Sequence, residues 1–599
     1  MPSPDFIIVG GGTAGLVVAN RLSEDPDVQV LVLEAGEDLT EDPRVIIPAM
    51  WTTLLGSDAD WQFSTAAQPG LKGRSIRQPR GKALGGSSAI NGQTFVAPSR
   101  VEINARGQLG NPGWDWEGLV PYFKKSYTLI PPADEATRQH LGIDWVDEAY
   151  RGTDGPLQVS FPGVKENPLC KAWIDAFRGM HKLTTGDPFS GKSTGAYSNA
   201  ASVDPASKTR SYAASAYGLP LKQRPNVRVI TGADVSRILF DETNQNSAVA
   251  TGVQASVGGK LQTFHAAKEV VLAAGSISTP KLLELSGVGD PGLLAKHGIH
   301  CVVDLPGVGE NLQDHLMTGM SYEVNDGVMT GDPLLRQEPE ALAMAQKLYV
   351  EHKAGPLTIG GLQSAAFMPL QGDTTYDQLM ATSKPRPQDA EYVKQVRSIL
   401  DREEADSHSA SWFMFLAQAN LHENGESFVG KELLPGNYAS LGCSQTSPFS
   451  RGATHIASAD PAAKPDIDPR YFSHPADLEI MARHVQALDK LRHVPELDVF
   501  FKKDGRRNHP DAHHIADLEG AKKYVLDTAT TTYHACGTTA MLPREKAGVV
   551  SPELVVYGTR NLRVVDAGIF PLVSRGNIMS LVYAVAEKAA DVIKAGQGN

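Results

Sequence analysis

Three glycines near the N-terminus are spaced to hold the phosphates of a dinucleotide. Gly10, Gly12 and Gly15 form a G-x-G-x-x-G pattern. The pattern follows the strand-like run 6–9 and precedes residues 16–22, whose apolar positions recur at helical spacing. Such glycines permit a tight turn that brings a pyrophosphate close to the backbone amides at the start of a helix. The residues expected at the phosphates are Gly10, Gly12, Thr13, Ala14 and Gly15.

An acidic residue lies where the second strand of such a unit would end. Glu34 follows the apolar run 28–33 and stands 19 residues after Gly15, so its carboxylate could accept hydrogen bonds from the hydroxyls of an adenosine ribose. Its negative charge argues against a 2′-phosphate, and Ala35 is expected beside it. No second fingerprint marks a separate nicotinamide site, which favours a tightly held FAD over NAD. The alternative is a glycine turn that serves only the close packing of a helix.

The elements that must position these residues are predicted along the whole chain. Residues 40–115 are rich in Gly, Pro and Ser and predict loops and short helices. Residues 226–275 predict a β-meander that ends in an apolar strand and returns the chain to the first sheet. Residues 320–525 predict polar helices, such as 338–352 and 477–491, mixed with loops and facing the substrate.

Five further runs occur in order along the chain. They are Gly81–Asn91, Gly275–Pro280, Asn311–His315, Tyr533–His534 and Val565–Ala567. In these runs the chain resembles the glucose-methanol-choline (GMC) flavin oxidoreductases, and the resemblance covers essentially its whole length. The resemblance implies that the protein uses FAD to oxidise a CH–OH group.

The same resemblance implies the fold class. We expect an α/β protein with a Rossmann-like FAD-binding domain (the GMC fold) and a discontinuous α+β substrate-binding domain that contains an antiparallel sheet. The expected FAD-binding domain comprises residues 1–45, 80–110, 223–320 and 528–599. Residues 46–79 are expected to form a lid or loop excursion, and residues 111–222 and 321–527 the substrate-binding domain.

The resemblance also predicts contacts along the FAD. The run 85–88 offers unhindered backbone amides and two hydroxyls, which suit phosphate oxygens and the polar edge of the flavin. Residues 91–94 are expected along the isoalloxazine, Val235 at the adenine, and 274–275 near the ADP part. Some family members carry a covalently joined histidine where this chain has Ile90, so we expect non-covalent FAD. The expected contacts beyond the N-terminal unit are Gly81, Gly85, Gly86, Ser87, Ser88, Asn91, Gly92, Gln93, Thr94, Val235, Ala274, Gly275, Asp566, Ala567, Asn577 and Ile578.

Oxidation of an alcohol by a flavin requires a base that works near neutral pH, and histidine can supply it. The resemblance implies that His534 is this base and that Asn577 is its partner. Because an amide cannot usefully exchange protons, Asn577 is expected to hydrogen-bond the alcohol oxygen. The expected reaction passes a proton to His534 and a hydride to flavin N5, and yields an aldehyde, ketone or lactone. The electrons then pass to O2 or another acceptor.

The C-terminal segment 577–594 predicts a helix that Asn577 opens. Its apolar residues share one face, and Lys588 and Lys594 lie towards its C-terminal end, where the helix dipole favours cations. The positive N-terminal end would then point at the N1 and O2 region of the flavin. The alternative is a packing helix whose end has no function.

Composition excludes several other classes of protein. Lys and Arg number 56 against 68 Asp and Glu, a net charge of −12 that argues against a nucleic-acid partner. No apolar run approaches the roughly 18 residues that a membrane span needs, and the four cysteines contain no C-x-x-C. We expect a soluble monomer or homodimer without a metal. The N-terminus lacks a leader and the chain lacks an N-glycosylation sequon, which predicts a cytoplasmic protein; a secreted mature form stays open.

Two patterns are misleading in their context. Residues 186–193 match a phosphate-binding loop, but Pro188 interrupts the run and no buried strand precedes it. His509 and His513 are four residues apart, but Pro510 between them spoils helical spacing for a metal, and a solvated loop is expected.

Substrate identity is the least determined feature. Residues 320–525 carry no signature, and only the His534/Asn577 pairing and the apolar segment Trp412–Phe415 favour small or aromatic primary alcohols. That segment could equally be core. The rival functions are a non-redox lyase or cyclase that keeps FAD on the same scaffold and, more weakly, a nicotinamide dehydrogenase.

Overall fold

A parallel sheet begins with the first residues of the chain. The computed structural model describes residues 3–597 apart from 164–166, 193, 242–246, 382–389, 401–407 and 420–432. The sheet has the order β10-β2-β1-β14-β26, and every pairing in it is parallel. β1 and β2 are fully buried, which explains why they read as unbroken apolar runs. The strands are β1 Phe6–Val9, β2 Val30–Leu33, β10 Val227–Ile230, β14 Glu269–Leu272 and β26 Leu562–Val564.

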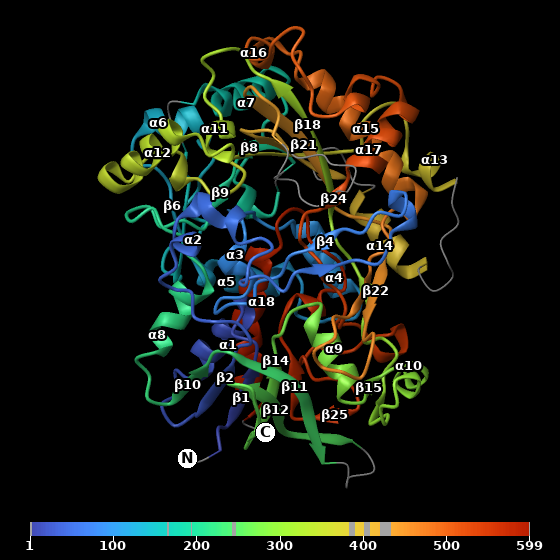
Figure 1. Ribbon diagram of the computed structural model, residues 1–599. Coiled ribbons are helices and arrows are strands. Elements are labelled where there is room, and N and C mark those ends of the chain that lie inside the picture. The colour runs from blue at the N-terminus through green and yellow to red at the C-terminus, as the bar shows by residue number, and fades with distance from the viewer. Residues whose placement is uncertain are drawn as a thin grey trace.

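Two helices from opposite ends of the chain pack together beside this sheet. α1 spans Thr13–Leu22 and α18 spans Met579–Gly596, and both chain termini lie at the lower end of the molecule in Figure 1. Arg21 of α1 forms a buried ion pair with Glu587 of α18. The parallel sheet and the helix after its first strand confirm the predicted Rossmann-like unit. The predicted start of the last helix was wrong, because Asn577 lies two residues before α18 and follows Gly576 with φ of +62°.

The predicted β-meander is present and packs next to the parallel sheet. Its strands are β11 Ala233–Asp241, β12 Ala248–Val257 and β13 Lys260–His265, and β12 also pairs in parallel with β25 Thr559–Arg560. β11 carries a register shift between Val235 and Arg237. Because such an irregularity re-aims side chains, it lets β11 present Val235 to the cavity described below.

The upper half of the molecule in Figure 1 contains a six-stranded sheet with the order β24-β18-β21-β20-β19-β8. All its pairings are antiparallel, which confirms the expected sheet type. Within 320–525 the sequence predicted helices and loops and missed strands β19 to β21. β19 and β21 are buried at every position and rich in small residues, so neither shows the alternation of a half-exposed strand. The strands are β8 Gly195–Ser198, β18 Leu316–Glu323, β19 Ser364–Met368, β20 Ala410–Phe415, β21 Tyr438–Gln445 and β24 Thr530–Thr531.

Helices cover the six-stranded sheet on its outer side. α15, Pro475–Leu491, packs against β21 and against α17, Leu518–Thr528. α7, Pro168–Gly179, packs against β8. The helices predicted at 338–352 and 477–491 are observed as α12 Pro339–His352 and as α15. Among the described residues, no helix combines the length and apolar character needed to cross a bilayer.

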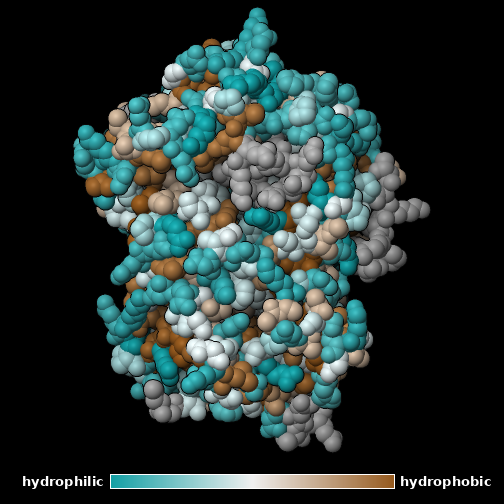
Figure 2. All heavy atoms as spheres, in the orientation of Figure 1, coloured by the Kyte–Doolittle hydropathy of each residue, from teal (hydrophilic) through white to brown (hydrophobic). Residues whose placement is uncertain are grey.

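Smaller elements connect the two sheets. Residues 40–115 contain short helices, as predicted, and also three two-residue strands that were not predicted. The face in Figure 2 is mostly hydrophilic, with hydrophobic residues in small separate patches. The remaining strands are β3 Phe63–Ser64, β4 Arg77–Gln78, β5 Thr94–Phe95, β6 Tyr127–Ile130, β7 Leu157–Ser160, β9 Ala200–Ala201, β15 Val288–Gly289, β16 Val303–Asp304, β17 Glu310–Leu312, β22 Gly452–His455 and β23 Asp466–Asp468. The remaining helices include α2 Pro43–Ile46, α3 Ser87–Ile90, α4 Arg100–Gln108, α5 Trp116–Ser126, α6 Glu135–Leu141, α8 Leu219–Leu221, α9 Ser278–Leu285, α10 Pro291–Lys296, α11 Asp332–Leu335, α13 Tyr376–Ala381, α14 Ala390–Leu400 and α16 Pro495–Asp498.

Candidate active site

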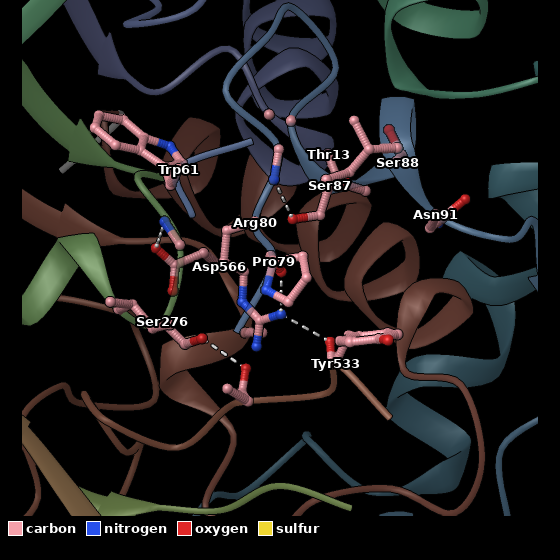
Figure 3. A pocket seen from close by; sticks show the side chains of 18 of the residues that line it. Thr13, Trp61, Pro79, Arg80, Ser87, Ser88, Asn91, Ser276, Tyr533 and Asp566 are labelled. Atoms are coloured by element: carbon pink, nitrogen blue, oxygen red, sulfur yellow. Dashed lines mark hydrogen bonds between the residues drawn. The ribbon is translucent and has the colours of Figure 1, made fainter. Parts of the chain in front are cut away.

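A cavity of about 340 Å³ opens at the carboxyl ends of β1, β2 and β14 and continues to the six-stranded sheet. Ligands of doubly wound sheets bind at this edge. Figure 3 shows part of its lining, with Thr13 and Ser87 on one side and Tyr533 on another. The predicted residues that line it are Gly10, Gly12, Thr13, Ala14, Glu34, Ala35, Gly81, Gly86, Ser87, Ser88, Asn91, Gly92, Gln93, Thr94, Val235, Ala274, Gly275, His534, Asp566, Ala567, Asn577 and Ile578.

Two predicted glycines do not line the cavity. A Cβ on Gly15 would stand 1.9 Å from the carbonyl oxygen of Gly10, so this glycine allows α1 to approach the turn closely. A Cβ on Gly85 would stand 2.7 Å from the ring of Tyr212. For these two positions, close packing replaces the predicted contact with the ligand.

The start of α1 supplies backbone donors to the cavity, because α1 follows Gly12 and no side chain caps its first amides. α3 follows Gly86, and its amides at Ser88 and Ala89 already donate to the backbone oxygens of Gly85 and Gly86. The two glycine loops touch, since a Cβ on Gly86 would lie 2.8 Å from the Cα of Gly12. Uncapped amides at a helix start form a site for anions such as phosphate. This donor set fits the pyrophosphate of a dinucleotide.

Glu34 stands at the end of β2 and lines the cavity. Its carboxylate accepts hydrogen bonds from the backbone amides of Gly11 and Gly36, each at 2.8 Å. Burial raises the pKa of Glu34 to about 7, although the two amides act in the opposite direction. A carboxylate has about four lone-pair positions, so two acceptor positions remain for a ribose.

His534 and Asn577 meet in the cavity. The amide Nδ2 of Asn577 lies 3.2 Å from the imidazole Nε2 of His534. The backbone amide of His534 donates to Asp314 at 2.9 Å, which fixes the loop after β24. Burial, followed by the nearby His315 and Arg80, holds the pKa of His534 well below its usual value. The resting imidazole is therefore neutral and able to accept a proton.

Two arginines were missed by the sequence analysis. Arg210 donates from Nη1 to the backbone oxygens of Ser88 at 3.1 Å and Asn91 at 2.7 Å, and so holds the segment after Gly86 from behind. Arg80 lines the cavity and donates to the backbone oxygen of Tyr533 at 3.0 Å (Figure 3). Its Nη2 is buried without a partner. Arg80 directly precedes the run at Gly81, the only signal that could have indicated it.

An apolar wall faces His534. It is formed by side chains from β18, β20 and the loops beside them: Met317, Leu362, Phe413, Phe415 and Tyr533. Residues alternate between the two faces of β20, so Phe413 and Phe415 line the cavity while Trp412 and Met414 belong to the core cluster behind it. The segment Trp412–Phe415 is thus both core and cavity lining.

The rejected motifs have other structures. The described part of 186–193 forms a short 3₁₀ turn, Pro188–Ser190, before β8; Ser193 lies outside the described residues. His509 was wrongly expected in a solvated loop. It is buried and caps the turn Pro510–His513 by accepting from the amide of Asp511. In the described part of the chain, no group of three or more His, Cys, Asp or Glu is arranged to hold a metal ion.

The sheet, the glycine turn and the cavity define a Rossmann-like α/β protein of the dinucleotide-binding class. The sequence matches the N-terminal GMC oxidoreductase family over residues 4–317 and the C-terminal GMC oxidoreductase family over residues 448–586. The chain belongs to the GMC oxidoreductases.

Known proteins resemble the chain over nearly its whole length. The dehydrogenase citC of Monascus ruber is 35% identical over 611 residues, which cover 98% of this chain and 96% of citC. A solved FAD-dependent oxidoreductase from Chaetomium thermophilum superposes with a TM-score of 0.87 at 30% identity, over 99% of both chains. A solved fungal aryl-alcohol oxidase superposes with a TM-score of 0.83 at 28% identity, over 100% of both chains. The GMC fold and the oxidoreductase class predicted from sequence are confirmed.

Proposed function

We propose that the protein oxidises an alcohol CH–OH group to an aldehyde, ketone or lactone with non-covalent FAD, and passes the electrons to O2 or another acceptor. The observation that carries the proposal is the contact between a neutral His534 and Asn577 inside a cavity that also contains the dinucleotide-type glycine turn. A base and a hydrogen-bond donor side by side are what removal of a hydroxyl proton requires.

The residues of the cavity fit FAD. The uncapped start of α1, with Ser87 beside it, would hold the pyrophosphate, Glu34 the ribose, and residues 91–94 the ring. Ile90 lines the same cavity and offers no nucleophile for a covalent bond. Once bound, FAD supplies the acceptor for the hydride that leaves the alcohol carbon. Acid precipitation of the protein should therefore release all of its FAD into the supernatant.

The chain's own residues would handle the proton. His534 accepts the hydroxyl proton at Nε2, and Asn577 donates from Nδ2 to the alcohol oxygen, which stabilises developing negative charge there. Burial of His534 keeps water away from the reacting oxygen, and Asp314 holds the backbone of the base in place. Both the proton transfer to His534 and the hydrogen bond from Asn577 require the substrate hydroxyl to lie next to Nε2 of His534.

The apolar wall favours an alcohol with an aromatic or aliphatic body. Phe413, Phe415 and Leu362 present carbon to the space beside His534, and aromatic substrates gain from stacked or edge contacts with such rings. The aryl-alcohol oxidase of the same fold supports this class. We further propose the two-domain division predicted from sequence. Cytoplasmic location and a monomeric or dimeric state stay predictions.

Anaerobic mixing of the yellow holoprotein with a panel of alcohols tests the function. Aryl-methyl alcohols, aliphatic primary alcohols and sugars form the arms of the panel. Bleaching of the flavin absorbance by at least one alcohol is the expected result. Bleaching by none of them would overturn the proposal and favour a non-redox lyase or cyclase. Peroxide release against dye reduction in air separates an oxidase from a dehydrogenase.

A further inference from the structure

A second imidazole lies directly behind the candidate base. His315 precedes β18 and is fully buried, and its Nδ1 lies 3.0 Å from Nδ1 of His534. The two rings are perpendicular, with centroids 5.2 Å apart. On its other side, Nε2 of His315 lies 3.0 Å from the backbone carbonyl oxygen of Thr446. The three groups form a linear chain that ends at the cavity.

The chemistry of these atoms assigns the protons. A carbonyl oxygen only accepts, so Nε2 of His315 carries a hydrogen and donates it to Thr446. A neutral imidazole has one N–H, which leaves a lone pair on Nδ1 of His315. Two lone pairs cannot face each other at 3.0 Å, so Nδ1 of His534 must carry a hydrogen. Nε2 of His534 is then the unprotonated nitrogen, and it accepts from Asn577.

We propose that His315 is a positioning residue that fixes His534 in the tautomer whose Nε2 can take the proton of the alcohol, with Thr446 setting the direction of the chain. The proposal rests on the function proposed above. The partner of a histidine's second nitrogen determines which nitrogen is protonated, and here a neutral imidazole takes that part.

The charged groups around the pair are accounted for. Asp314, next to His315 in the chain, accepts hydrogen bonds from the side chains of Gln78, Tyr471 and Thr531 and from the backbone amide of His534. The positive charge of Arg80 disfavours protonation of His534 and so lowers the pKa of its imidazole. Burial lowers the pKa of His315 to about 4, against the opposing effects of Asp314 and Thr446. His315 therefore remains an acceptor across the neutral range.

Two nearly isosteric variants separate positioning from packing. His315→Asn keeps an acceptor oxygen near the place of Nδ1, whereas His315→Leu keeps a similar bulk and removes the acceptor. We expect His315→Leu to slow flavin reduction at saturating alcohol on the order of 10–100-fold, the scale known for the outer partners of metal-binding histidines. His315→Asn is expected to stay within about fivefold of wild type, with little change in KM for either variant. Equal losses in the two variants would overturn the proposal.

Nitrogen-15 NMR of histidine-labelled holoprotein tests the tautomers without turnover. The expected signals are an unprotonated Nε2 and a protonated Nδ1 for His534, assigned by their disappearance in His534→Gln. A protonated Nε2 in the resting wild type would overturn the proposal, even if the Leu variant fails to fold. If the predicted tautomers are found but no alcohol reduces the flavin, the proposed function fails and the proton assignment survives.

Discussion

Asn577 donates to His534 across 3.2 Å although 43 positions separate them in the chain. The imidazole nitrogen that should receive the substrate proton is therefore already engaged by an amide in the resting protein. A hydroxyl group that enters must insert at this contact, where it can donate to Nε2 and accept from Nδ2. The two residues thus define one point at which the reacting oxygen binds.

Replacing the base should abolish the chemistry and leave the fold intact. We expect His534→Ala to slow flavin reduction at least about a hundredfold, the usual scale for loss of a general base, while FAD stays bound. Stopped-flow absorbance measures the rate, and the flavin spectrum reports occupancy. The exposed His352 provides the control, since His352→Ala should reduce at the wild-type rate. Near-normal reduction by His534→Ala would remove the assigned base.

A charge next to the base should move the pH profile in a known direction. Asn577→Asp puts a carboxylate in place of the amide that lies 3.2 Å from Nε2 of His534. Its negative charge raises the pKa of His534. Because only neutral His534 accepts a proton, the acid limb of flavin reduction should shift to higher pH than in wild type. Asn577→Leu removes the same hydrogen bond without adding charge and should lower the rate without that shift. Superimposable profiles for the Asp and Leu variants would contradict the assigned contact.

The glycine turn should control binding of the cofactor. Gly15→Ala drives a methyl group into the carbonyl of Gly10, which a Cβ would approach to 1.9 Å. We expect this variant to purify without yellow FAD. Gly186→Ala is the matched control, because a Cβ there meets nothing within 4 Å. The ratio of FAD to protein measures the effect, and a wild-type ratio in Gly15→Ala would speak against the turn as the pyrophosphate site.

Substrate preference should depend on one face of β20. Phe413→Ala removes apolar surface from the cavity and should lower kcat/KM for aryl alcohols by about tenfold or more, since burying such a side chain is worth about 1.5–3 kcal/mol. Met414→Leu changes the opposite face at nearly constant volume and should leave kcat/KM unchanged. If both variants lose kcat/KM equally, the cavity does not extend to Phe413.

A histidine outside the cavity lining should make stability depend on pH. His455 lies between Glu284 at 2.6 Å and Glu310 at 3.3 Å. Burial opposes its charge, but the two carboxylates outweigh burial and raise the pKa of His455 to about 9. The folded-state pKa exceeds the unfolded one, so this stabilisation is complete below about pH 6.5 and disappears as the pH rises through 9.

The variant His455→Gln keeps hydrogen bonding and removes the charge. Wild type should unfold at a higher temperature than His455→Gln at pH 6, and the two Tm values should converge at pH 10. His300→Gln, at an exposed position outside helices and strands, controls for general histidine effects. A constant difference between wild type and His455→Gln across this range would contradict the assigned charge.

The cofactor cradle could be predicted from short runs because its chemistry is local. Gly10, Gly12 and Glu34 act through a turn and two strand ends that lie within one βαβ unit. The contact between His315 and His534 could not be predicted, because 219 positions separate them and only the docking of β24 on β18 brings them together. The contact of Arg210 with Asn91 could not be predicted for the same reason, since 119 positions separate the two residues.

Local conformation explains the other differences. The helix at the C-terminus was predicted from apolar periodicity, which extends into residues that are not helical. The left-handed conformation of Gly576 delays the start of the helix to Met579. Strand β21 was missed because a strand buried on both faces shows no alternation of polar and apolar residues. Burial on two faces depends on neighbours that only the folded chain supplies.

Because one face of β20 lines the cavity and the other belongs to the core, substitutions on the two faces have different consequences. Substitutions at the odd-numbered positions, Phe413 and Phe415, change the surface of the cavity and so retune which molecules enter. Even-numbered positions, Trp412 and Met414, are constrained by the surrounding scaffold. A library that varies apolar residues at the odd positions alone would explore new specificities while the core contacts of the even positions stay in place.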